Sequence, residues 1–306
     1  MNNALVSVVL CTYNGDKFLA EQIDSVLRQT YAPLELIISD DASADGTREI
    51  LKRYENNPVV RIFLQEKNIG LIKNFAFATE QAQGTLIAFC DQDDIWLEHK
   101  IETLVNGIGS APLVYSDSLL VDEKGNSLNK KLSDLRKMYS GTDSRGYILY
   151  SCVWGHGMLI TKQLLKKSSP MNEEIHHDIW LVFQAFLHGG IKYHGEILTH
   201  YRQHSNSSSI TLPQKLPSRN SDQRYTDYKR RLRWITILQQ HERPEFQPFY
   251  KKLLSLYTKN EQQEYVFPLV FFMLKYRRAM FMLTQKNCFS HFIEILKLAR
   301  GERKTY

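Results

Sequence analysis

The sequence predicts an α/β fold, a doubly wound and mostly parallel sheet followed by a C-terminal helical appendage. Up to about residue 120, short apolar runs of β-forming residues alternate with amphipathic helical patterns. These runs are apolar on both faces, which is typical of parallel strands covered by helices. From about residue 215 the chain becomes basic, aromatic and helical. The alternation therefore predicts an open sheet with helices on both sides, and the last part predicts the appendage.

Five apolar runs are the expected strands, at 6–10, 34–39, 59–64, 85–90 and 112–116. Three helical stripes lie between them, carried by Phe18, Leu19, Ile23, Val26 and Leu27, by Ile50, Leu51 and Tyr54, and by Phe75, Ala78 and Ala82. Further along, a hairpin is expected around Lys124-Gly125-Asn126, and an apolar helix from Asp178 to Gly189-Gly190. Ligands bind at the carboxyl ends of the strands in such sheets, so the residues after each run matter most.

Composition restricts the function classes. Of 306 residues, 43% are hydrophobic and 24% charged, as in an ordinary globular protein. Four cysteines stand far apart without C-x-x-C, which favours a reducing compartment. The first residues lack a secretory signal, and the longest apolar run, 266–274, has about half of the ~20 residues that span a bilayer. We therefore expect a cytoplasmic protein.

Charge divides the chain unevenly. Residues 215–306 hold 19 Lys+Arg against 8 Asp+Glu, leaving 20 against 25 for residues 1–214. A basic end on a mildly acidic body indicates an anionic surface partner for that end rather than a nucleic-acid-binding protein. The segments 229–240 and 266–283 combine apolar stripes, aromatics and Arg/Lys, as a helix on the inner face of an anionic membrane would. Packing on the body, with solvated bases, and self-association into a homo-oligomer remain alternatives.

Polar residues follow three of the expected strands. They are Thr12, Tyr13, Asn14 and Gly15 after the first, Asp40 to Thr47 after the second, and Asp91, Gln92, Asp93 and Asp94 after the fourth. Neither a G-x-G-x-x-G dinucleotide fingerprint nor a P-loop is present in the sequence. The expected site is rich in carboxylates instead.

The cluster from Asp91 to Asp94 suits Mg²⁺ or Mn²⁺, which take hard oxygen ligands and share them with substrate phosphates. The alternative is an Asp-rich turn, or a cap for a helix that starts near Trp96. Asp45 and Thr47 are explained as caps of the helix that follows them. Asp41 lies upstream beside the expected crevice, where it could accept the N3–H of uracil or thymine while Tyr13 stacks on the base.

Three segments now resemble a known family. VSVVLCTYNG, LELIISDDASADGT and EKNIGLIKNFAFATEQAQGTLIAFCDQDDIW, in this order and spacing, closely resemble glycosyltransferase family 2, nucleotide-sugar-dependent enzymes of the GT-A fold. The strong match covers 5–120, and weaker motifs extend to about 210. The segments DQDDIW and YRQH are most similar to those of rhamnosyltransferases of surface-polysaccharide assembly. The resemblance implies a transferase that moves a sugar from a UDP- or dTDP-linked donor, dTDP-rhamnose at the narrowest, to a glycan or lipid-linked glycan.

The resemblance also implies residue roles. It divides the chain into a donor-binding half (1–120), an acceptor-binding half with the catalytic base (121–214) and the basic helical region (215–306). The donor side would comprise Thr12, Tyr13, Asn14, Asp41, Lys73, Asn74, Asp91, Gln92 and Asp93. Asp41 and Tyr13 match the base-binding pair, and Asp91 and Asp93 the D-x-D motif, near the ribose and on the metal-bound diphosphate. Lys73 and Asn74 are a looser match.

The second half carries weaker matches. Asp178 in EIHHDIW matches the catalytic base of inverting members, with His177 in place of the usual Glu. In THYRQHSNSSS, His204 falls near the metal, with Arg202 and Asn206 beside it. A metal bridging the diphosphate and a carboxylate taking the acceptor's proton would give single displacement with inversion.

Three further side chains are candidates for acceptor binding: Trp154, His156 and Trp180. A structural histidine between two glycines, and core packing for the two tryptophans, are the alternatives. Two other functions stay open, a nucleotidyltransferase that makes nucleotide sugars and a non-catalytic nucleotide- or glycan-binding protein. CTYNGDKF lacks the Gly-rich basic loop of the former.

Overall fold

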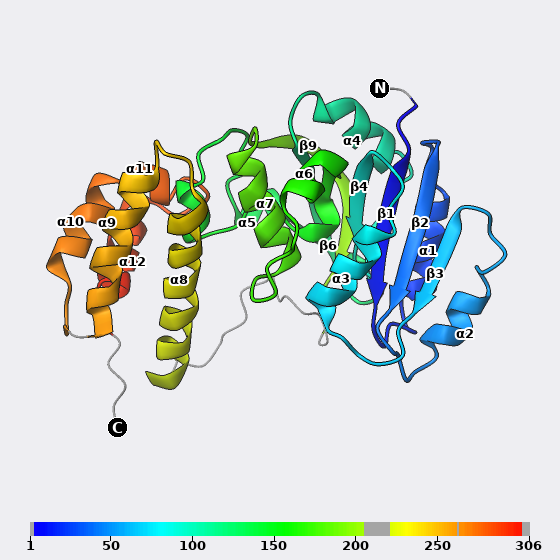
Figure 1. Cartoon of the computed structure of the whole chain (residues 1–306), viewed down its shortest axis with the longest axis horizontal. Coiled ribbons are helices and arrows are strands. Elements are labelled where there is room, and N and C mark those ends of the chain that lie inside the picture. The colour runs from blue at the N-terminus through cyan, green and yellow to red at the C-terminus, as the bar shows by residue number, and fades with distance from the viewer. Residues whose placement is uncertain (1–2, 205–220, 262, 302–306) are drawn as a thin grey trace. The chain divides into compact units, whose positions relative to one another are not determined.

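The computed structural model describes residues 3–204, 221–261 and 263–301. The predicted loop SNSSS with Asn206 lies outside the described residues, as does nearly all of the Pro- and Ser-containing linker that follows it. The chain forms two compact units, here called the sheet unit (Met1–Thr142 and Cys152–Ser208) and the helical unit (Asp143–Ser151 and Ser209–Tyr306). Figure 1 shows the elements of both.

The described part of the sheet unit contains a nine-stranded sheet in the order β3-β2-β1-β4-β8-β6-β9-β5, with β7 paired to β6. The strands are β1 (Val6–Thr12), β2 (Leu34–Asp40), β3 (Val60–Leu64), β4 (Leu86–Cys90), β5 (Ile95–Trp96), β6 (Leu113–Val121), β7 (Ser127–Lys131), β8 (Met158–Thr161) and β9 (Ile191–Arg202). β1 pairs in parallel with β2 and β4, and β2 with β3. These parallel strands confirm the α/β expectation and have their carboxyl ends at one edge.

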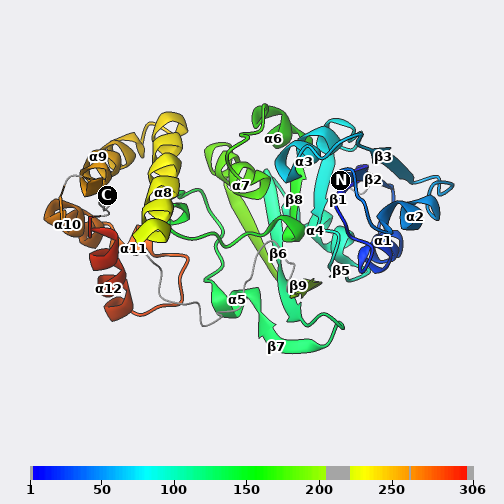
Figure 2. The same ribbon diagram turned by 90° about the horizontal axis from the view of Figure 1, so that it is seen from below.

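The second half of the sheet is mixed. β8 runs antiparallel to both β4 and β6, whereas β6 and β9 are parallel. The predicted hairpin is present, since β6 and β7 pair around Gly125, which has φ 84° (Figure 2). Such a φ is open to glycine without a steric penalty.

Alternate residues of the parallel strands face different helices. One face, with Val8 and Leu10, packs against α1 (Leu19–Leu27), α2 (Thr47–Lys52) and α4 (Lys100–Ile108). On the other face, Phe89 of β4 contacts Phe75 of α3 (Leu71–Glu80) and a ring at the start of α7 (His177–Leu187). Each fully buried aliphatic side chain stabilises the fold by about 1.5–3 kcal/mol. The short helices α5 (Leu132–Leu135) and α6 (Lys162–Lys167) complete this unit.

One expected helix start is wrong. No helix begins near Trp96; Ile95 and Trp96 form β5, antiparallel to β9, and α4 begins at Lys100. The Trp96 side chain is buried and its backbone N–H donates to Ser25 Oγ at 3.1 Å. Burial of this ring and pairing with β9 therefore outweigh the local capping signal of Asp94.

The helical unit contains α8 (Ser221–His241), α9 (Gln247–Tyr257), α10 (Phe267–Lys275), α11 (Arg277–Met280) and α12 (Cys288–Leu298). Residues 143–151 belong to it although they come from the middle of the chain. The hydroxyl of Ser144, which is fully buried, donates to Glu242 at 2.5 Å and lies 2.9 Å from the Tyr250 hydroxyl. Among the described residues, the helices are too short or too polar to cross a bilayer.

Candidate active site

The carboxyl ends of β1, β2 and β4 bring the predicted donor residues to one edge. Thr12 pairs with Asp40, and Leu10 pairs with Cys90. The residues that follow each strand therefore emerge at the same edge, with Asp41 and Asp91 on either side of the end of β1. Sequence reasoning placed them there from strand ends alone, because parallel strands share a direction.

Gln92 joins the ends of β4 and β1. Its Oε1 accepts hydrogen bonds from Thr12 Oγ1 at 2.6 Å and from the Tyr13 backbone N–H at 2.9 Å. Gly15 leaves room for this amide, since a Cβ there would lie 2.4 Å from Gln92 Oε1. The contacts fix the backbone of Tyr13, whose side chain is 48% exposed. Thr12 and Gln92 thus position the backbone of Tyr13.

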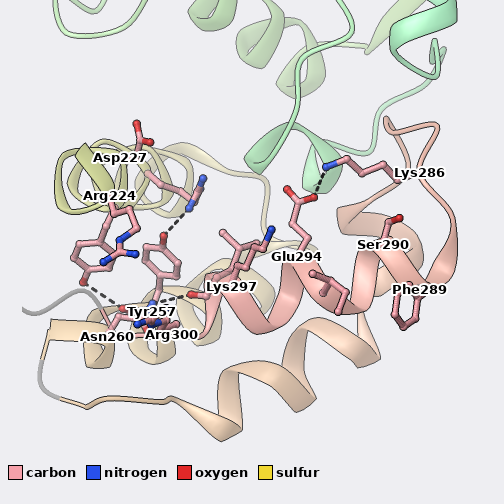
Figure 3. A pocket seen from close by; sticks show the side chains of 14 residues that line it. Arg224, Asp227, Tyr257, Asn260, Lys286, Phe289, Ser290, Glu294, Lys297 and Arg300 are labelled. Atoms are coloured by element: carbon pink, nitrogen blue, oxygen red, sulfur yellow. Dashed lines mark hydrogen bonds and ion pairs between the residues drawn. The ribbon is translucent and has the colours of Figure 1, made fainter. Parts of the chain in front are cut away.

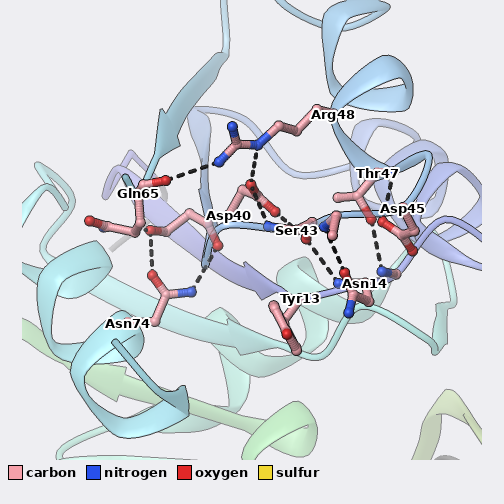
Figure 4. Close-up of polar contacts among 12 residues, drawn as sticks. Tyr13, Asn14, Asp40, Ser43, Asp45, Thr47, Arg48, Gln65 and Asn74 are labelled. Atoms are coloured by element: carbon pink, nitrogen blue, oxygen red, sulfur yellow. Dashed lines mark hydrogen bonds and ion pairs between the residues drawn. The ribbon is translucent and has the colours of Figure 1, made fainter. Parts of the chain in front are cut away.

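A second polar network joins the loops after β1 and β2 (Figure 4). Asp40 is fully buried, pairs with Arg48 Nε at 2.9 Å and accepts the hydroxyl of Ser43. Ser43 Oγ in turn accepts the backbone N–H of Asn14 at 2.9 Å, and Asn14 Oδ1 accepts the Ala44 N–H at 2.9 Å. Asn14 therefore holds the two loops together.

Asp41 fixes the backbone that leads into α3. Its side chain is 3% exposed, and its carboxylate accepts the backbone N–H groups of Ile69 at 2.7 Å and Gly70 at 2.9 Å. A carboxylate has about four acceptor positions, so two bonds leave capacity for a further donor. The surroundings fit a group that both shapes the crevice and accepts one more N–H.

The looser matches on α3 lie differently. Asn74 is buried, accepts the Ser39 hydroxyl at 2.6 Å and donates to the Ser39 carbonyl at 2.9 Å. This amide fastens α3 to β2, which corrects the expectation that it lines the donor pocket. Lys73 is half exposed and pairs with Glu173 at 3.3 Å. Its cation is at the surface of the unit.

Asp91, Asp94 and His156 form a compact group, with one ligand atom of each within 4.8 Å of the others. His156 Nδ1 lies 3.7 Å from Asp91 Oδ2 and 3.5 Å from Asp94 Oδ2. Its Nε2 lies 3.0 Å from Ser118 Oγ. Asp94 Oδ2 is buried and has no hydrogen-bond partner among the described residues. Carboxylate oxygens and an imidazole nitrogen are a donor set that divalent cations accept.

The charged side chains of this group shift one another's pKa values. Burial, with Asp93 and Asp91 nearby, raises the pKa of Asp94 well above its usual value. Burial also acts to raise the pKa of Asp91, but the hydrogen bond and charge of His156 outweigh it and lower the pKa. Burial lowers the pKa of Lys100 to about 7. Lys100 Nζ donates to the His156 carbonyl at 2.6 Å and to Thr199 Oγ1 at 2.7 Å, so this lysine supports the group from below.

Asp93 and His204 form a second pair, which is more open than Asp94 and His156. His204 Nε2 lies 2.8 Å from Asp93 Oδ2, and the two side chains are 10% and 19% exposed. Burial and the charge of Asp91 raise the pKa of Asp93, against the opposing effect of His204. Arg202 Nε donates to the Asp93 carbonyl at 2.9 Å, and its guanidinium covers the Phe18 ring. The predicted neighbours Asp93, Arg202 and His204 are thus together.

The start of α7 places Asp178 beside Gly155, where a Cβ would lie 3.6 Å from Asp178 Cβ. Asp178 is partly exposed, and its Oδ1 accepts the Ile179 backbone N–H at 2.7 Å. His177 points into the core instead, stacked on Phe75 with 3.9 Å between ring centroids. Burial lowers the pKa of His177, although Asp178 and Asp91 oppose the shift. A neutral ring is therefore favoured, and it cannot assist Asp178 as a cation.

The three expected acceptor residues differ in burial. Trp180 is 7% exposed and its Nε1 donates to the Ser168 carbonyl at 2.8 Å, so the packing alternative describes it. His156 is 1% exposed and lies inside the carboxylate group, which corrects its placement at an acceptor surface. Trp154 is partly exposed and directly precedes Gly155, which lies beside Asp178.

Sequence reasoning missed Lys100 and left Asp94 open between the metal cluster and a helix cap. Lys100 gave no signal because a lysine at the start of an amphipathic helix is ordinary. The burial of both depends on β9, about a hundred residues away, whose Arg202 N–H donates to Asp94 Oδ1 at 3.0 Å. Nothing local predicts such a contact.

Comparisons with known proteins identify the family of the chain. A family model described as glycosyl transferase family 2 matches residues 7–168. An uncharacterized glycosyltransferase of Rickettsia prowazekii is 28% identical over 219 residues, which are 69% of this chain and 68% of that protein. The putative teichuronic acid biosynthesis glycosyltransferase TuaG of Bacillus subtilis is 40% identical over 99 residues, 32% of this chain and 39% of TuaG.

A third relative is the Escherichia coli enzyme WfgD, named as a UDP-Glc:alpha-D-GlcNAc-diphosphoundecaprenol beta-1,3-glucosyltransferase. It is 35% identical over 106 residues, 35% of this chain and 42% of WfgD.

Two solved structures show the same fold. The crystal structure of Staphylococcus aureus TarS residues 1–349 has a TM-score of 0.57 at 17% identity, covering 95% of this chain and 80% of that one. The mannosyltransferase PcManGT of Pyrobaculum calidifontis, solved with GDP-Man and Mn²⁺, has a TM-score of 0.56 at 14% identity, covering 97% and 75%. Together with a family model that spans more than half of the chain, they show that this protein is a GT-A-fold transferase belonging to glycosyl transferase family 2.

Proposed function

We propose that the protein transfers a sugar from a nucleoside-diphosphate sugar to a hydroxyl group of a glycan or lipid-linked glycan in surface-polysaccharide assembly. The observation that carries the proposal is the gathering of Asp41, Asp91 and Asp93 at the ends of β2 and β4, with Asp178 opening α7. The names of TuaG and WfgD and the TarS structure in complex with UDP-GlcNAc support the substrate classes.

The donor base would lie against Tyr13 and Asp41. Asp41 has acceptor capacity left after its two backbone bonds, and uracil or thymine offers an N3–H. Tyr13 has an exposed ring whose backbone Gln92 holds in place, so stacking on it needs little reordering. This supports a UDP- or dTDP-linked sugar. A rhamnosyl group is the narrowest form of the proposal and rests on the wording DQDDIW and YRQH alone.

Asp93 and His204 would hold the divalent cation, Mn²⁺ or Mg²⁺. Mg²⁺ keeps several positions for water and substrate phosphate, so its ligands must be reachable. Asp93 and His204 are more open than Asp94 and His156, whose side chains are 0% and 1% exposed. When bound, the cation stabilises the charge that develops on the diphosphate leaving group. Arg202 orients Asp93 through its backbone carbonyl, and Asp91 would lie toward the ribose.

Asp178 would take the proton of the acceptor hydroxyl. A carboxylate at the start of a helix is favoured by the N–H groups there, and partial exposure leaves room for an acceptor. Proton transfer on the side opposite to the leaving group gives single displacement with inversion. Trp154 would contribute to the acceptor side.

Thermal unfolding with a panel of uridine, thymidine and guanosine diphosphate sugars, each with and without Mn²⁺, tests the donor. A ligand at a hundred times its Kd stabilises the folded state by about 2.7 kcal/mol, so a preferred donor should stand out. A second measurement, of sugar released from the preferred donor, should then detect turnover. Stabilisation by sugar phosphates with nucleoside triphosphates would favour a nucleotidyltransferase, and binding without turnover would favour a binding protein.

We further propose that the helical unit attaches the enzyme to an anionic membrane surface, at the cytoplasmic face, without crossing it. Bases outnumber acids in residues 215–306, and large rings are exposed on α10 and α12, where Phe271 is 71% and Phe289 72% exposed. Bases beside exposed rings suit an anionic interface. Vesicle binding that needs anionic lipid and weakens with salt supports attachment; a concentration-dependent oligomer with no vesicle binding would contradict it.

A further inference from the structure

The helical unit contains a cavity of about 790 Å³ between α8 and α12 (Figure 3). One wall comes from Arg224, Tyr228 and Arg231, which are spaced i, i+4, i+7 on α8. The opposite wall comes from positions of α12 with the same kind of spacing, such as Phe289, Ile293 and Lys297. Residues at these spacings share one face of a helix, so the first half of α8 and one face of α12 line the cavity, here called the α8–α12 groove.

Positive charge dominates the α8–α12 groove. Five cations line it, Arg224, Arg231, Lys286, Lys297 and Arg300, against the carboxylates of Asp227 and Glu294. Lys286 pairs with Glu294 at 2.6 Å. Lys297 and Arg300 are exposed, and neither has an ion-pair partner within the part of the chain that the structure describes. Two cations are therefore left for an external anion.

The floor of the groove carries an unused acceptor. Asn260 is 1% exposed; its Nδ2 donates to the Leu298 carbonyl at 2.9 Å, whereas its Oδ1 has no hydrogen-bond partner among the described residues. A buried polar atom without a partner costs about 1–3 kcal/mol, and a ligand that brings a donor removes that cost. Lipid headgroups that carry hydroxyl or amino groups beside the phosphate bring such a donor.

The rim of the groove is apolar. Phe289 is 72% and Ile293 36% exposed. The aromatic rings deeper inside, Tyr228 and Tyr257, are only 2% and 3% exposed and stack on each other at 5.1 Å. They offer no free face to a nucleotide base or a sugar ring. Cations below an exposed apolar rim match an amphiphile whose phosphate enters the groove while its acyl chains contact the rim.

We propose that the α8–α12 groove binds the phosphate-bearing headgroup of an anionic membrane lipid. The proposal rests on the membrane attachment proposed above and assigns it to one place. The α8–α12 groove, rather than the overall positive charge of the helical unit, recognises the lipid. It is independent of the donor site, whose residues all belong to the sheet unit.

The test compares two double variants in vesicle co-sedimentation. Lys297→Gln with Arg300→Gln removes the unpaired groove cations, and Lys251→Gln with Lys252→Gln removes two exposed cations of α9 that do not line the groove. Each base near an anionic surface contributes enough for about a fivefold change in partitioning, so the groove variant, which lacks two bases, should lose roughly 25-fold on phosphatidylglycerol vesicles. The control should lose far less. Phe289→Ser should also weaken binding, and pure phosphatidylcholine should bind none of the proteins.

Three other results would overturn the proposal in whole or in part. Equal losses in the groove and control variants would mean diffuse attachment and would reject the groove. No binding of the unaltered protein to anionic vesicles would reject attachment and groove together. Protection from thermal unfolding by soluble pyrophosphate that depends on Lys297 and Arg300, with Phe289→Ser fully active on vesicles, would assign the groove to a soluble anion. Donor-induced stabilisation should be unchanged in all variants, which keeps a failure of the transferase proposal distinct.

Discussion

Asp93 is a carboxylate whose surroundings oppose its ionisation, because burial and Asp91 raise its pKa. A cation held by Asp93 and His204 would offset that opposition. We predict that Asp93→Asn lowers transfer by at least about a hundredfold, a size typical of losing one group that stabilises charge in a transition state, and removes metal-dependent nucleotide binding. Glu66→Gln, an exposed carboxylate of the same unit, is the matched control. Full turnover of chelator-treated protein would contradict the metal role.

Asp178 should separate binding from chemistry. We predict that Asp178→Asn lowers kcat by about a hundredfold or more and leaves donor affinity nearly unchanged, because a general base acts only on the acceptor's proton. Isothermal titration with the donor and initial rates at saturating acceptor give the two quantities, and Asp93→Asn, which should lose donor binding, is the contrast. Near-normal kcat in the variant would place the base elsewhere, and a product of retained configuration would exclude single displacement.

The position of a site residue could be predicted from sequence where it depends on a strand end, as for Asp41 and Asp91, which follow β2 and β4. It could not where an equally polar side chain turns inward. Lys73 and Asn74 are adjacent polar residues in an otherwise apolar stretch, yet Asn74 bonds to Ser39 of β2 whereas Lys73 is half exposed. Trp180 likewise satisfies its indole N–H inside the core. Side-chain direction within a helix depends on its packing partner, which a single sequence does not contain.

At the scale of elements, the first turn of α7 combines an outward carboxylate with an inward ring. His177 lies between Phe75 and Phe89, and neither ring nitrogen has a hydrogen-bond partner among the described residues. Such orphaned polar atoms cost about 1–3 kcal/mol when buried. Gly155 leaves space beside His177 Nε2, because a Cβ at position 155 would lie 3.3 Å from that nitrogen.

We therefore predict that His177→Phe raises the free energy of unfolding by about 1 kcal/mol at pH 8 and reduces its loss on acidification. Burial lowers the pKa of His177 in the folded state below the unfolded value of about 6.5, so the unfolded chain binds the extra proton. This contribution to stability is present above pH ~6.5 and is lost as pH falls toward the folded pKa. Thermal unfolding at pH 8 and pH 5.5 measures both effects; a less stable Phe variant with unchanged acid sensitivity would contradict them.

Elements with local signals could be predicted well. β1, β2 and β4 are apolar on both faces, and α1 and α3 carry regular stripes between them. β8 and β5 are short and gave no such signal. Each forms because strands distant in sequence offer unpaired backbone groups: β8 pairs with β4 and β6, and β5 pairs with β9. Pairing of this kind depends on tertiary context more than on propensity.

At the scale of the whole molecule, the helical unit is not a simple C-terminal addition. Tyr147 and Ile148, from the middle of the chain, are 4% and 5% exposed within it, and the Tyr147 carbonyl accepts Trp234 Nε1–H at 3.2 Å. We predict that a chain ending at Ser208 aggregates or unfolds at lower temperature than the full chain, because these apolar side chains lose their cover. Light scattering and thermal unfolding measure this.

The matched control is the same shortened chain with Tyr147→Ser and Ile148→Ser, which should be more soluble. A shortened chain without these changes that stays monodisperse and unfolds at the original temperature would contradict the prediction. Point variants in the helical unit are accordingly better probes of membrane attachment than its removal.

The excursion of residues 143–151 into the helical unit also sets an order of events during synthesis. These residues leave the ribosome about a hundred residues before two of the partners that cover them, Glu242 and Tyr250, have been made. At roughly 5–20 residues per second, the delay is on the order of 5–20 s. During that interval the nascent chain presents Tyr147 and Ile148 in the open, a recognition target for chaperones that bind emerging polypeptides. The same arrangement means that a related enzyme could not acquire this helical module by joining genes end to end, because the module is encoded in two pieces.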